Sequence, residues 1–404
     1  MILRNWILVA DVYEAKANDV DRAVESAKKA FPARSELDGS ERRRLMLKLA
    51  DLVDDNAAEF ARLETLSMRK PVATYIDQVM GTANVEIIPM IMICFKVGPA
   101  LIAGNTLVLK SSEKASLTSP LFARLAKEAR FPPGVLNILS GFGLPCEDAI
   151  ARHMDILNIA FTGSTRTGKI IQKAAVDSNL KSCTLELGGK SPLIVFEDAD
   201  LEKVAKAAAF SIVSNSGQVC MASSRVYVQN SIADRFEKLY TQAIQELSGQ
   251  PGNPLDRSTS FGPQADGQQF KIISGYLEQA QKDGLRCLPM DKSSQQEGTN
   301  FVSPIVFHDV PKGHPLMKEE IFGDPTGQRP EYGLYASVFT RDLNRAIRVA
   351  KDFEAGSIGV NTSSPYYYQD VPLGGFKGSG TGRELGDEGL EAWTEVKSVY
   401  ISLS

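Results

Sequence analysis

The sequence is short of the residues that build disulfide frameworks and metal sites. It has five cysteines, an odd number, and three histidines among its 404 residues. The cysteines are scattered without C-x-x-C spacing, and no histidine has metal-ligand spacing or a neighbouring cysteine. These absences argue against a disulfide-stapled scaffold, a zinc site and a Cys-His protease arrangement. The thiols favour a reducing compartment, and we predict a cytoplasmic protein without a metal.

Long apolar runs and blocks of like charge are also absent. The longest apolar run, residues 87–95, is too short to cross a bilayer and is closed by Lys96. Residues 1–14 carry one arginine, no small-residue cleavage site and the acids Asp11 and Glu14, which makes them a poor signal peptide. The 45 Lys and Arg against 49 Asp and Glu give a net charge of -4 with no basic block. We therefore expect no membrane and no nucleic acid as partner, but a small molecule or another subunit.

The chain does have the apolar content of a large core and a regular alternation of helices and strands. Hydrophobic residues make up 43% of it, and its length favours two domains. Apolar spacing predicts helices at residues 20–31, behind Asn18 as N-cap, and at 45–53. The β-rich runs that follow lie at residues 106–110, 135–139, 157–161, 183–187, 192–196, 225–229, 336–340 and 357–361, with helical stretches at 200–213, 231–247 and 266–283 among them. This alternation predicts an α/β fold with parallel sheets.

Two adjacent glycines, Gly188 and Gly189, mark the predicted boundary between two α/β units. Glycine lets a chain turn sharply, so we place a hinge or cleft there. The polar residues 291–300 are expected to form an exposed loop.

Two glycine-bearing turns follow predicted strands. The first, SGFGLPC at 140–146, has a cysteine where G-x-G-x-x-G needs its last glycine. The second, GSTRTGKI at 163–170, nearly spells a Walker A loop, but Ile170 stands where a hydroxyl should bind magnesium. What remains is a strand, a Gly-Ser turn and a helix. That arrangement suits the pyrophosphate of a dinucleotide and equally suits a plain turn.

Cys220 is the cysteine most suited to chemistry, because it follows a polar, glycine-bearing stretch at the end of a predicted helix. The other four, Cys94, Cys146, Cys183 and Cys287, fit the ordinary role of a buried small hydrophobe. Glu186 ends a strand that should be largely buried, and burial would raise its pKa toward that of a general base. The alternative for Glu186 is a salt bridge to Lys190 or another cation.

Several segments together resemble the aldehyde dehydrogenase superfamily, whose members oxidise aldehydes to carboxylic acids with NAD(P). The segments are GPALIAGNTLVLKSSE (98–113), FPPGVLNILSGFG (131–143), IAFTGSTRTGK (159–169), LELGGKSPLIVFEDADL (185–201), SNSGQVCMASSRVYV (214–228), KEEIFG (318–323), YGLYASVFT (332–340) and PLGGFKGSGTGRELG (372–386). Their shared order makes chance an unreasonable explanation. The resemblance implies a Rossmann-like cofactor-binding domain over residues 1–188, a catalytic α/β domain over 189–388, and an oligomerisation strand over 389–404 that joins a partner subunit in a homo-oligomer.

The same resemblance assigns the catalytic residues. Cys220 matches the nucleophile that adds to the aldehyde carbon and gives a thiohemiacetal, then a thioester. Glu186 matches the base that activates water to hydrolyse the thioester, in agreement with the argument from burial.

Cofactor positions also carry over. Lys110 and Glu113 match the residues that hydrogen-bond the adenosine ribose, and a carboxylate there would repel a 2' phosphate, so NAD is expected over NADP, which stays possible. Gly163 and Ser164 match the turn beneath the pyrophosphate, and Glu320 and Phe322 the pair that positions the nicotinamide ribose. The further cofactor-binding positions are Gly168 and Leu187.

The chain departs from the family in one side chain and in two stretches. The family places a Trp-Asn pair after the proline that Pro89 matches, but here Met90 follows, and Asn84 lies upstream of the motif. Losing that oxyanion donor costs roughly 3 to 4 kcal/mol of transition-state stabilisation. Stretches are also missing near residues 78–87 and after Gly323, as in a splice variant or faulty gene model. The alternative reading is therefore an impaired or inactive member that at most binds dinucleotide. A thiol esterase acting through Cys220 without NAD is a third reading.

Overall fold

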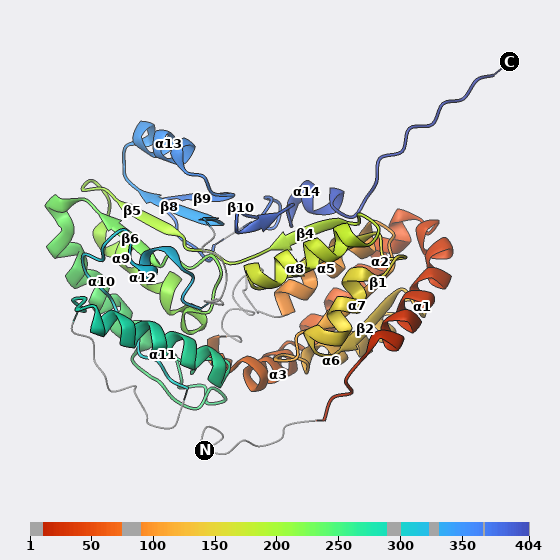
Figure 1. The fold of residues 1–404 in the computed structure, drawn as a ribbon, viewed down its shortest axis with the longest axis horizontal. Helices are drawn as coiled ribbons and strands as arrows, with labels where there is room; N and C mark the ends of the chain where they lie inside the picture. The colour runs from red at the N-terminus through yellow and green to blue at the C-terminus, as the bar shows by residue number, and fades with distance from the viewer. Residues whose placement is uncertain (1–10, 75–89, 289–299, 323–330, 367, 404) are drawn as a thin grey trace.

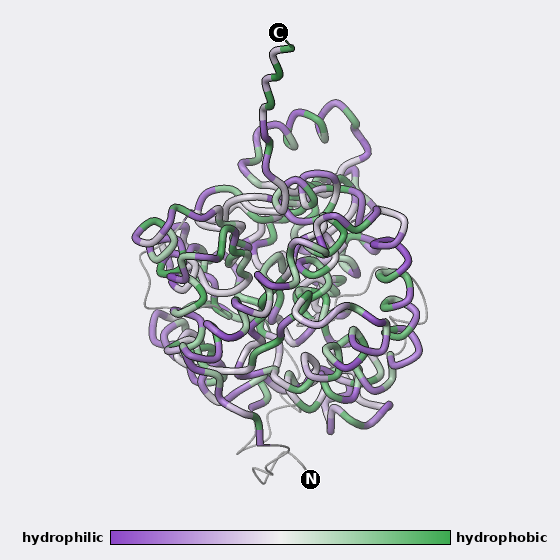
Figure 2. The backbone as a smooth tube through the Cα atoms, turned by 90° about the vertical axis from the view of Figure 1, so that its right-hand side faces the viewer, coloured by the Kyte–Doolittle hydropathy of each residue, from purple (hydrophilic) through white to green (hydrophobic). Residues whose placement is uncertain are grey.

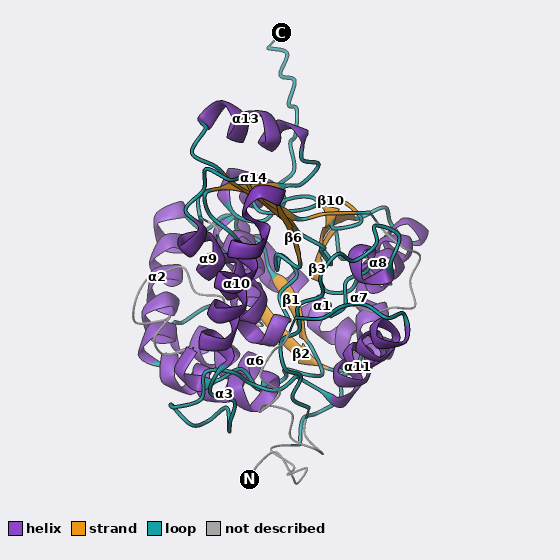
Figure 3. Cartoon of the chain, turned by 90° about the vertical axis from the view of Figure 1, so that its left-hand side faces the viewer, coloured by secondary structure: helices purple, strands orange, loops and turns teal. Residues whose placement is uncertain are grey.

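The computed structural model describes residues 11–74, 90–288, 300–322, 331–366 and 368–403. Asn84, Pro89, the missing stretches near 78–87 and after Gly323, the opening residues 1–10 and most of the predicted loop 291–300 lie outside the described residues. The chain forms two lobes that are connected by strands at the upper edge in Figure 1. They also contact each other elsewhere, because the Val72 N–H donates to the Pro254 carbonyl and Lys114 pairs with Asp266. Strands lie inside and helices lie around them (Figure 3).

The N-terminal lobe begins with three amphipathic helices, α1 (Ala17–Ser35), α2 (Gly39–Asp55) and α3 (Ala57–Met68). The predicted cap of the first helix is wrong. Lys16 is the N-cap of α1, and the carboxylate of Asp19 accepts its backbone N–H at 2.9 Å. An acid three residues after the N-cap accepts the backbone N–H of the N-cap residue and so stabilises the first turn of the helix. The helix therefore begins at Ala17, and Asn18 lies inside its first turn.

Four short parallel strands run through this lobe in two pairs. β1 (Leu107–Ser111) pairs with β2 (Leu136–Ser140), and β3 (Asn158–Thr162) pairs with β4 (Ser182–Glu186). The helices around them are α5 (Met90–Ile102), α6 (Thr118–Glu128), α7 (Asp148–Arg152) and α8 (Thr165–Asp177). The apolar faces of α5 and α6 pack with β1 and β2 in a core that contains Leu101, Leu125 and Val135. Those of α7 and α8 pack with β3 and β4 in a second core.

The second lobe is built on a four-stranded parallel sheet in the order β6-β5-β8-β9. Its strands are β5 (Pro192–Val195), β6 (Arg225–Val228), β8 (Tyr335–Phe339) and β9 (Ser357–Val360). Its helices are α9 (Leu201–Val213), α10 (Ala233–Ser248), α11 (Gly267–Lys282), α12 (Pro315–Lys318) and α13 (Leu343–Asp352). The strands match the predicted runs, and the predicted α/β class with parallel sheets is confirmed.

The last part of the chain returns to the first lobe. β7 (Tyr332–Gly333) pairs with β10 (Phe376–Lys377), and β11 (Gly380–Thr381) adds antiparallel to β4. Ala392 and Trp393 follow α14 (Gly386–Glu391). Their backbone carbonyls accept hydrogen bonds from the Asn158 and Asn105 side chains, respectively, of the first lobe. The N-terminal sheet thus depends on residues from beyond the predicted boundary, and that boundary stays a prediction.

Residues 394–403 form no helix or strand within this chain and project away from the body (Figure 1). Hydrophobic residues recur along this tail (Figure 2), and Val396, Tyr400 and Leu403 are exposed. The strand predicted for 389–404 begins inside α14, and its pairing with a partner subunit stays a prediction. No helix of the described chain is both long enough and apolar enough to cross a membrane.

Candidate active site

The turn from β3 into α8 places four predicted cofactor residues side by side. Gly163 is exposed in the turn, and its N–H donates to the Glu186 carbonyl at 3.0 Å. Ser164 caps α8, because its hydroxyl accepts from the backbone N–H of Thr167. Gly168 lies against the side chain of Leu187, which leaves no room for a larger residue. The result is an open helix N-terminus of the kind that binds phosphate groups.

Lys110 and Glu113 meet at the carboxyl end of β1. The Lys110 Nζ atom lies 3.4 Å from Glu113 Oε2 and 3.7 Å from Glu147 Oε2. The two predicted residues are thus neighbours, as the resemblance implies. The second carboxylate, Glu147, is a site residue that the sequence reasoning missed. It directly follows the SGFGLPC turn, which was set aside because it lacks the last glycine of the dinucleotide pattern.

Glu186 is buried at the end of β4, where only 7% of its surface is exposed. Its Oε1 atom has no hydrogen-bond partner among the described residues, and Gly374 lies directly against it. Burial, followed by the nearby charge of Glu384, raises the pKa of Glu186 well above its usual 4.5. The alternative for Glu186, a salt bridge to Lys190 or another cation, is absent from the described part of the chain. Desolvation without a paired cation is what produces a carboxylate basic enough to take a proton near neutral pH.

A buried ion pair lies beside Glu186. Lys96 from α5 and Glu384 from the C-terminal segment are 2.6 Å apart, and the Lys96 ammonium also donates to Thr162 at the end of β3. Lys96 lowers the pKa of Glu186 and Glu384 raises it, so the effects of the two charges on that pKa oppose each other. The two residues are 288 positions apart, and no local pattern could have predicted that they pair.

Cys220 follows a tight turn after α9. Asn215, Ser216 and Gly217 all have positive φ, at 50°, 56° and 77°. Three side chains hold this turn in place: the amides of Asn215 and Gln218 donate to each other's backbone carbonyl oxygens, and the Gln264 amide donates to the backbone carbonyl of Ser216. Left-handed conformations in residues other than glycine persist only where the surroundings enforce them, and they cluster at functional sites.

Gly188 and Gly189 bring Glu186, Cys220 and Glu320 together. A Cβ atom on Gly188 would overlap the Glu320 carboxylate, and one on Gly189 would overlap the Cys220 carbonyl oxygen. Neither glycine has a positive φ, so their backbone conformation is open to other residues, and the predicted hinge or cleft stays a prediction. The glycines are needed because two other segments approach the backbone here too closely for any side chain.

Glu320 is held in this contact by one hydrogen bond, from the Gly189 N–H to Oε1 at 3.0 Å. Burial raises the pKa of Glu320 to about 7, and the Gly189 N–H and the Lys190 charge oppose that rise. Lys190 is itself buried, which lowers its pKa to about 7, and the nearby Arg225 charge adds to this. Phe322 is half-buried two residues after Glu320. Sequence reasoning treated Lys190 only as a partner for Glu186 and missed Arg225, whose guanidinium donates to the Lys190 carbonyl.

The remaining cysteines follow the prediction in part. Cys146 is buried and Cys183 is half-buried, but Cys94 and Cys287 are exposed, so the prediction of burial is wrong for these two. An apolar neighbourhood in sequence does not decide which side of a helix or loop a residue occupies. Among the described residues no group of three His, Cys, Asp or Glu side chains could hold a metal ion.

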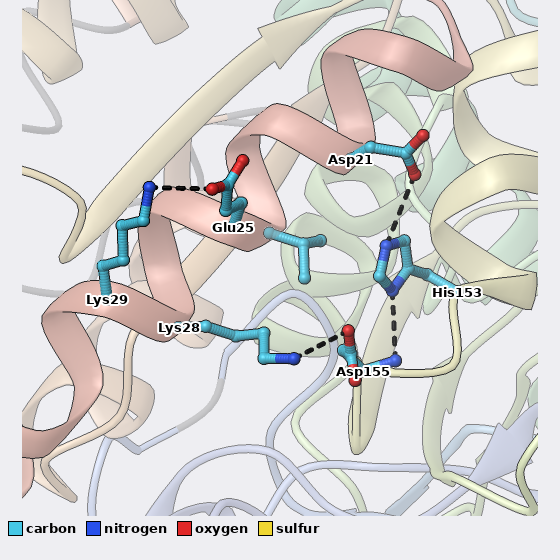
Figure 4. A pocket seen from close by; sticks show the side chains of 7 residues that line it. Asp21, Glu25, Lys28, Lys29, His153 and Asp155 are labelled. Carbon is cyan, nitrogen blue, oxygen red and sulfur yellow. Dashed lines mark hydrogen bonds and ion pairs between the residues drawn. The ribbon is translucent and has the colours of Figure 1, made fainter.

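One surface hollow of about 470 Å³ lies between α1 and the loop after α7, and no predicted site residue lines it. Its charged groups pair with one another (Figure 4). His153 lies 3.4 Å from Asp21, Lys28 lies 2.9 Å from Asp155, and Lys29 lies 2.7 Å from Glu25. Because these charges are already satisfied, the hollow is a poor candidate for an active site.

The fold and these residues define a chain of the aldehyde dehydrogenase family. The model of the "Aldehyde dehydrogenase family" matches residues 7–86, 88–324 and 329–399, so the chain belongs to this family. It is 39% identical to mitochondrial aldehyde dehydrogenases of Mesocricetus auratus and Homo sapiens, with 98% of this chain and 90% and 87% of those proteins covered.

Solved structures agree. A crystal structure of indole-3-acetaldehyde dehydrogenase in complex with NAD+ has a TM-score of 0.90 and 36% identity, covering 98% of this chain and 91% of that one. The aldehyde dehydrogenase KauB from Pseudomonas aeruginosa has a TM-score of 0.89 and 35% identity, with the same coverage.

These alignments also bear on the predicted missing stretches. The alignment to the Homo sapiens relative runs over 454 residues, whereas this chain has 404, so the relative contains stretches without a counterpart here. The family match breaks at residue 87 and between 324 and 329, which is where the sequence predicts the losses.

The buried carboxyl of Glu186 predicts a pH-dependent stability. Its pKa is raised in the folded state, so its stabilising contribution is present below the usual 4.5 and is lost as pH rises through the folded-state pKa. Glu186→Gln cannot ionise and escapes this loss. We expect the melting temperature of Glu186→Gln minus that of the wild type to increase from pH 5 to pH 8. The exposed control Glu278→Gln should show a constant difference, and a constant difference for Glu186→Gln would contradict the account.

Proposed function

We propose that this chain oxidises an aldehyde to a carboxylic acid with NAD as hydride acceptor, through a thioester on Cys220. The observation that supports this most is the contact at Gly188 and Gly189. There, the backbone of Cys220 and the carboxylate of Glu320 both lie against a segment that begins two residues after Glu186. A thiol, a buried base and a cofactor-positioning carboxylate are the groups that the reaction needs in one place.

The described residues fit a dinucleotide. The exposed Gly163 turn at the N-terminus of α8 offers backbone N–H groups to a pyrophosphate, and Lys110 and Glu113 lie at the carboxyl end of the neighbouring β1. Glu320 would hold the nicotinamide ribose, and Gly168, Leu187 and Phe322 would complete the cofactor contacts. When bound, NAD would supply the two-electron acceptor for the aldehyde hydrogen.

The chain's own groups carry the remaining steps. The Cys220 thiol gives up its proton to solvent as its sulfur adds to the aldehyde carbon, and the backbone N–H of Cys220 donates to the oxygen that becomes negative. Loss of a hydride from that carbon leaves a thioester. The Glu186 carboxylate then takes a proton from a water molecule while the water oxygen attacks the thioester carbon. The acid is released, and the departing sulfur takes that proton from Glu186 and is a thiol again. Aldehyde, NAD and water are consumed, and acid, NADH and a proton are formed.

The second candidate is an impaired member of the family that at most binds dinucleotide. Met90 follows Pro89 directly, which leaves no counterpart for the oxyanion Asn, and relatives contain stretches that this chain lacks. With only one main oxyanion donor, a rate reduced by about a hundredfold to a thousandfold relative to a complete site is expected.

We further propose the predicted division into a dinucleotide half, residues 1–188, and a catalytic half, residues 189–388. The exposed apolar tail within 389–404 supports a homo-oligomer in which that tail pairs with another subunit. The five cysteines lie in the described residues and form no disulfide, which supports a reducing compartment, for which we keep the cytoplasm, although the relatives of Mesocricetus auratus and Homo sapiens are mitochondrial.

Removing the nucleophile and removing the base should have different kinetic signatures. Cys220→Ala should form no NADH from NAD and any aldehyde of a test panel. Glu186→Gln should give a burst of one NADH per active site and then turn over about a hundredfold to ten-thousandfold more slowly than wild type, because thioester hydrolysis has lost its base. Stopped-flow absorbance of NADH measures both. Steady turnover in Cys220→Ala, or unchanged turnover in Glu186→Gln, would overturn the assignment. No turnover in folded, NAD-binding wild type would favour the impaired member.

The charge of Glu113 should set the choice of cofactor. Glu113→Gln keeps the shape and removes the charge that would repel a 2' phosphate, so the NADP-to-NAD ratio of kcat/KM should rise by roughly three- to tenfold. Paired assays with both cofactors measure the ratio, with Glu278→Gln as the control. An unchanged ratio would mean that Glu113 does not face the ribose.

A further inference from the structure

Four fully buried serines from three segments meet beside the Cys220 turn. Ser211 lies on α9, Ser223 lies three residues after Cys220, and Ser363 and Ser364 lie in the loop after β9; each has 0% exposure. The Ser223 N–H donates to Ser211 Oγ at 2.9 Å. The Oγ atoms of Ser211 and Ser364 are 2.6 Å apart, and those of Ser223 and Ser363 are 3.0 Å apart. We call these four residues the serine cluster.

The cluster connects one helix, α9, with two loops, and none of these three segments is a strand of a sheet. Ser223 and Ser364 both bind Ser211, so the chain after Cys220 and the loop after β9 are anchored to the same helix position. A buried hydroxyl costs stability when it is left unpaired and contributes when it is bonded. Each of these four hydroxyls has a partner, whereas the equally buried Ser337 hydroxyl on β8 has none among the described residues.

The cluster completes the restraint of Cys220. On its N-terminal side, the turn at 215–217 is held by Gln218 and Gln264. On its C-terminal side, the bond from the Ser223 N–H to Ser211 fixes the chain only three residues beyond the thiol. The same cluster fixes the loop that carries Tyr366, whose ring stacks on Phe210 at a centroid distance of 6.1 Å. Phe210 precedes Ser211 directly, so the same part of α9 contacts both the chain after Cys220 and the loop that carries Tyr366.

We propose that the serine cluster is a positioning device that holds the Cys220 thiol in its reactive orientation, with Ser211 as its central member. This inference rests on the proposed role of Cys220 as nucleophile. None of the four serines needs to touch substrate; they act through the backbone on both sides of Cys220. Small displacements of a reacting group lower rates strongly, so loss of the central hydroxyl should be visible in the chemistry and not only in stability.

The test compares Ser211→Ala, Ser223→Ala and Ser363→Ala with the matched control Ser337→Ala. Ser211→Ala removes two bonds of the cluster, whereas Ser223→Ala and Ser363→Ala each remove the same single Oγ to Oγ bond. We expect kcat to fall by about tenfold to a hundredfold in Ser211→Ala and less in the other two, with KM for NAD unchanged. The kcat of the double variant Ser223→Ala/Ser363→Ala should fall no further than that of either single variant, because each single variant already loses the one bond that the two hydroxyls share. Ser337→Ala should keep the wild-type kcat.

The rate of Cys220 alkylation by iodoacetamide, followed by mass spectrometry of the Cys220 peptide without NAD or aldehyde, gives a second readout. It should change in Ser211→Ala and stay at the wild-type value in Ser337→Ala. Lowered melting temperature with unchanged kcat and alkylation rate would show a purely structural cluster and overturn the proposal. If Ser211→Ala does not fold, Ser363→Ala and Ser223→Ala decide by the same two readouts. If the wild type forms no NADH but Cys220 alkylation still changes in Ser211→Ala, the positioning role is upheld and the proposed function is refuted.

Discussion

The active site depends on a backbone contact that only glycine permits. At Gly188 and Gly189 the carboxylate of Glu320 and the carbonyl oxygen of Cys220 occupy the space that a side chain would need. A side chain and a backbone carbonyl from two other segments therefore lie directly against the glycine backbone. Glu186, Glu320 and Cys220 come from segments far apart in sequence, and this contact is what brings those segments together. Interiors are close-packed, so even one added methyl group has to displace one of the three segments.

The second constraint is electrostatic. Glu186, Lys190 and the Lys96–Glu384 pair are buried in this region and Glu320 is half-buried, and desolvation raises the pKa of Glu186 and Glu320 and lowers that of Lys190. Burying so many ionisable groups costs folding free energy, and the Lys96–Glu384 pair offsets only part of it. Such a cost is typical of active sites, where a low dielectric strengthens the interactions that act on the reacting groups. The buried ionisable groups of this region therefore lower the stability of the fold while strengthening the interactions that the proposed chemistry needs.

Sequence patterns predicted what is local. The strands from residue 106 to 361 were predictable from short β-rich runs, and the turn at Gly163 and Ser164 from its position between a strand and a helix. The resemblance to the family supplied Cys220, Glu186 and Glu320 together. The Lys96–Glu384 pair and the serine cluster were not predictable, because each joins residues that are more than a hundred positions apart in the sequence. Gly188 and Gly189 were recognised, but for turning rather than for close approach, since the approaching segments are invisible in the local sequence.

The central claim is that Cys220, Glu186 and the nicotinamide end of the cofactor meet at Gly188 and Gly189. A crystal structure of the chain with NAD bound tests it directly. The account predicts the nicotinamide ribose on Glu320, with the Cys220 sulfur and the Glu186 carboxyl group on either side of the space next to the ring. A dinucleotide bound elsewhere, or a Cys220 thiol walled off from the ring by hydrocarbon side chains, would contradict it.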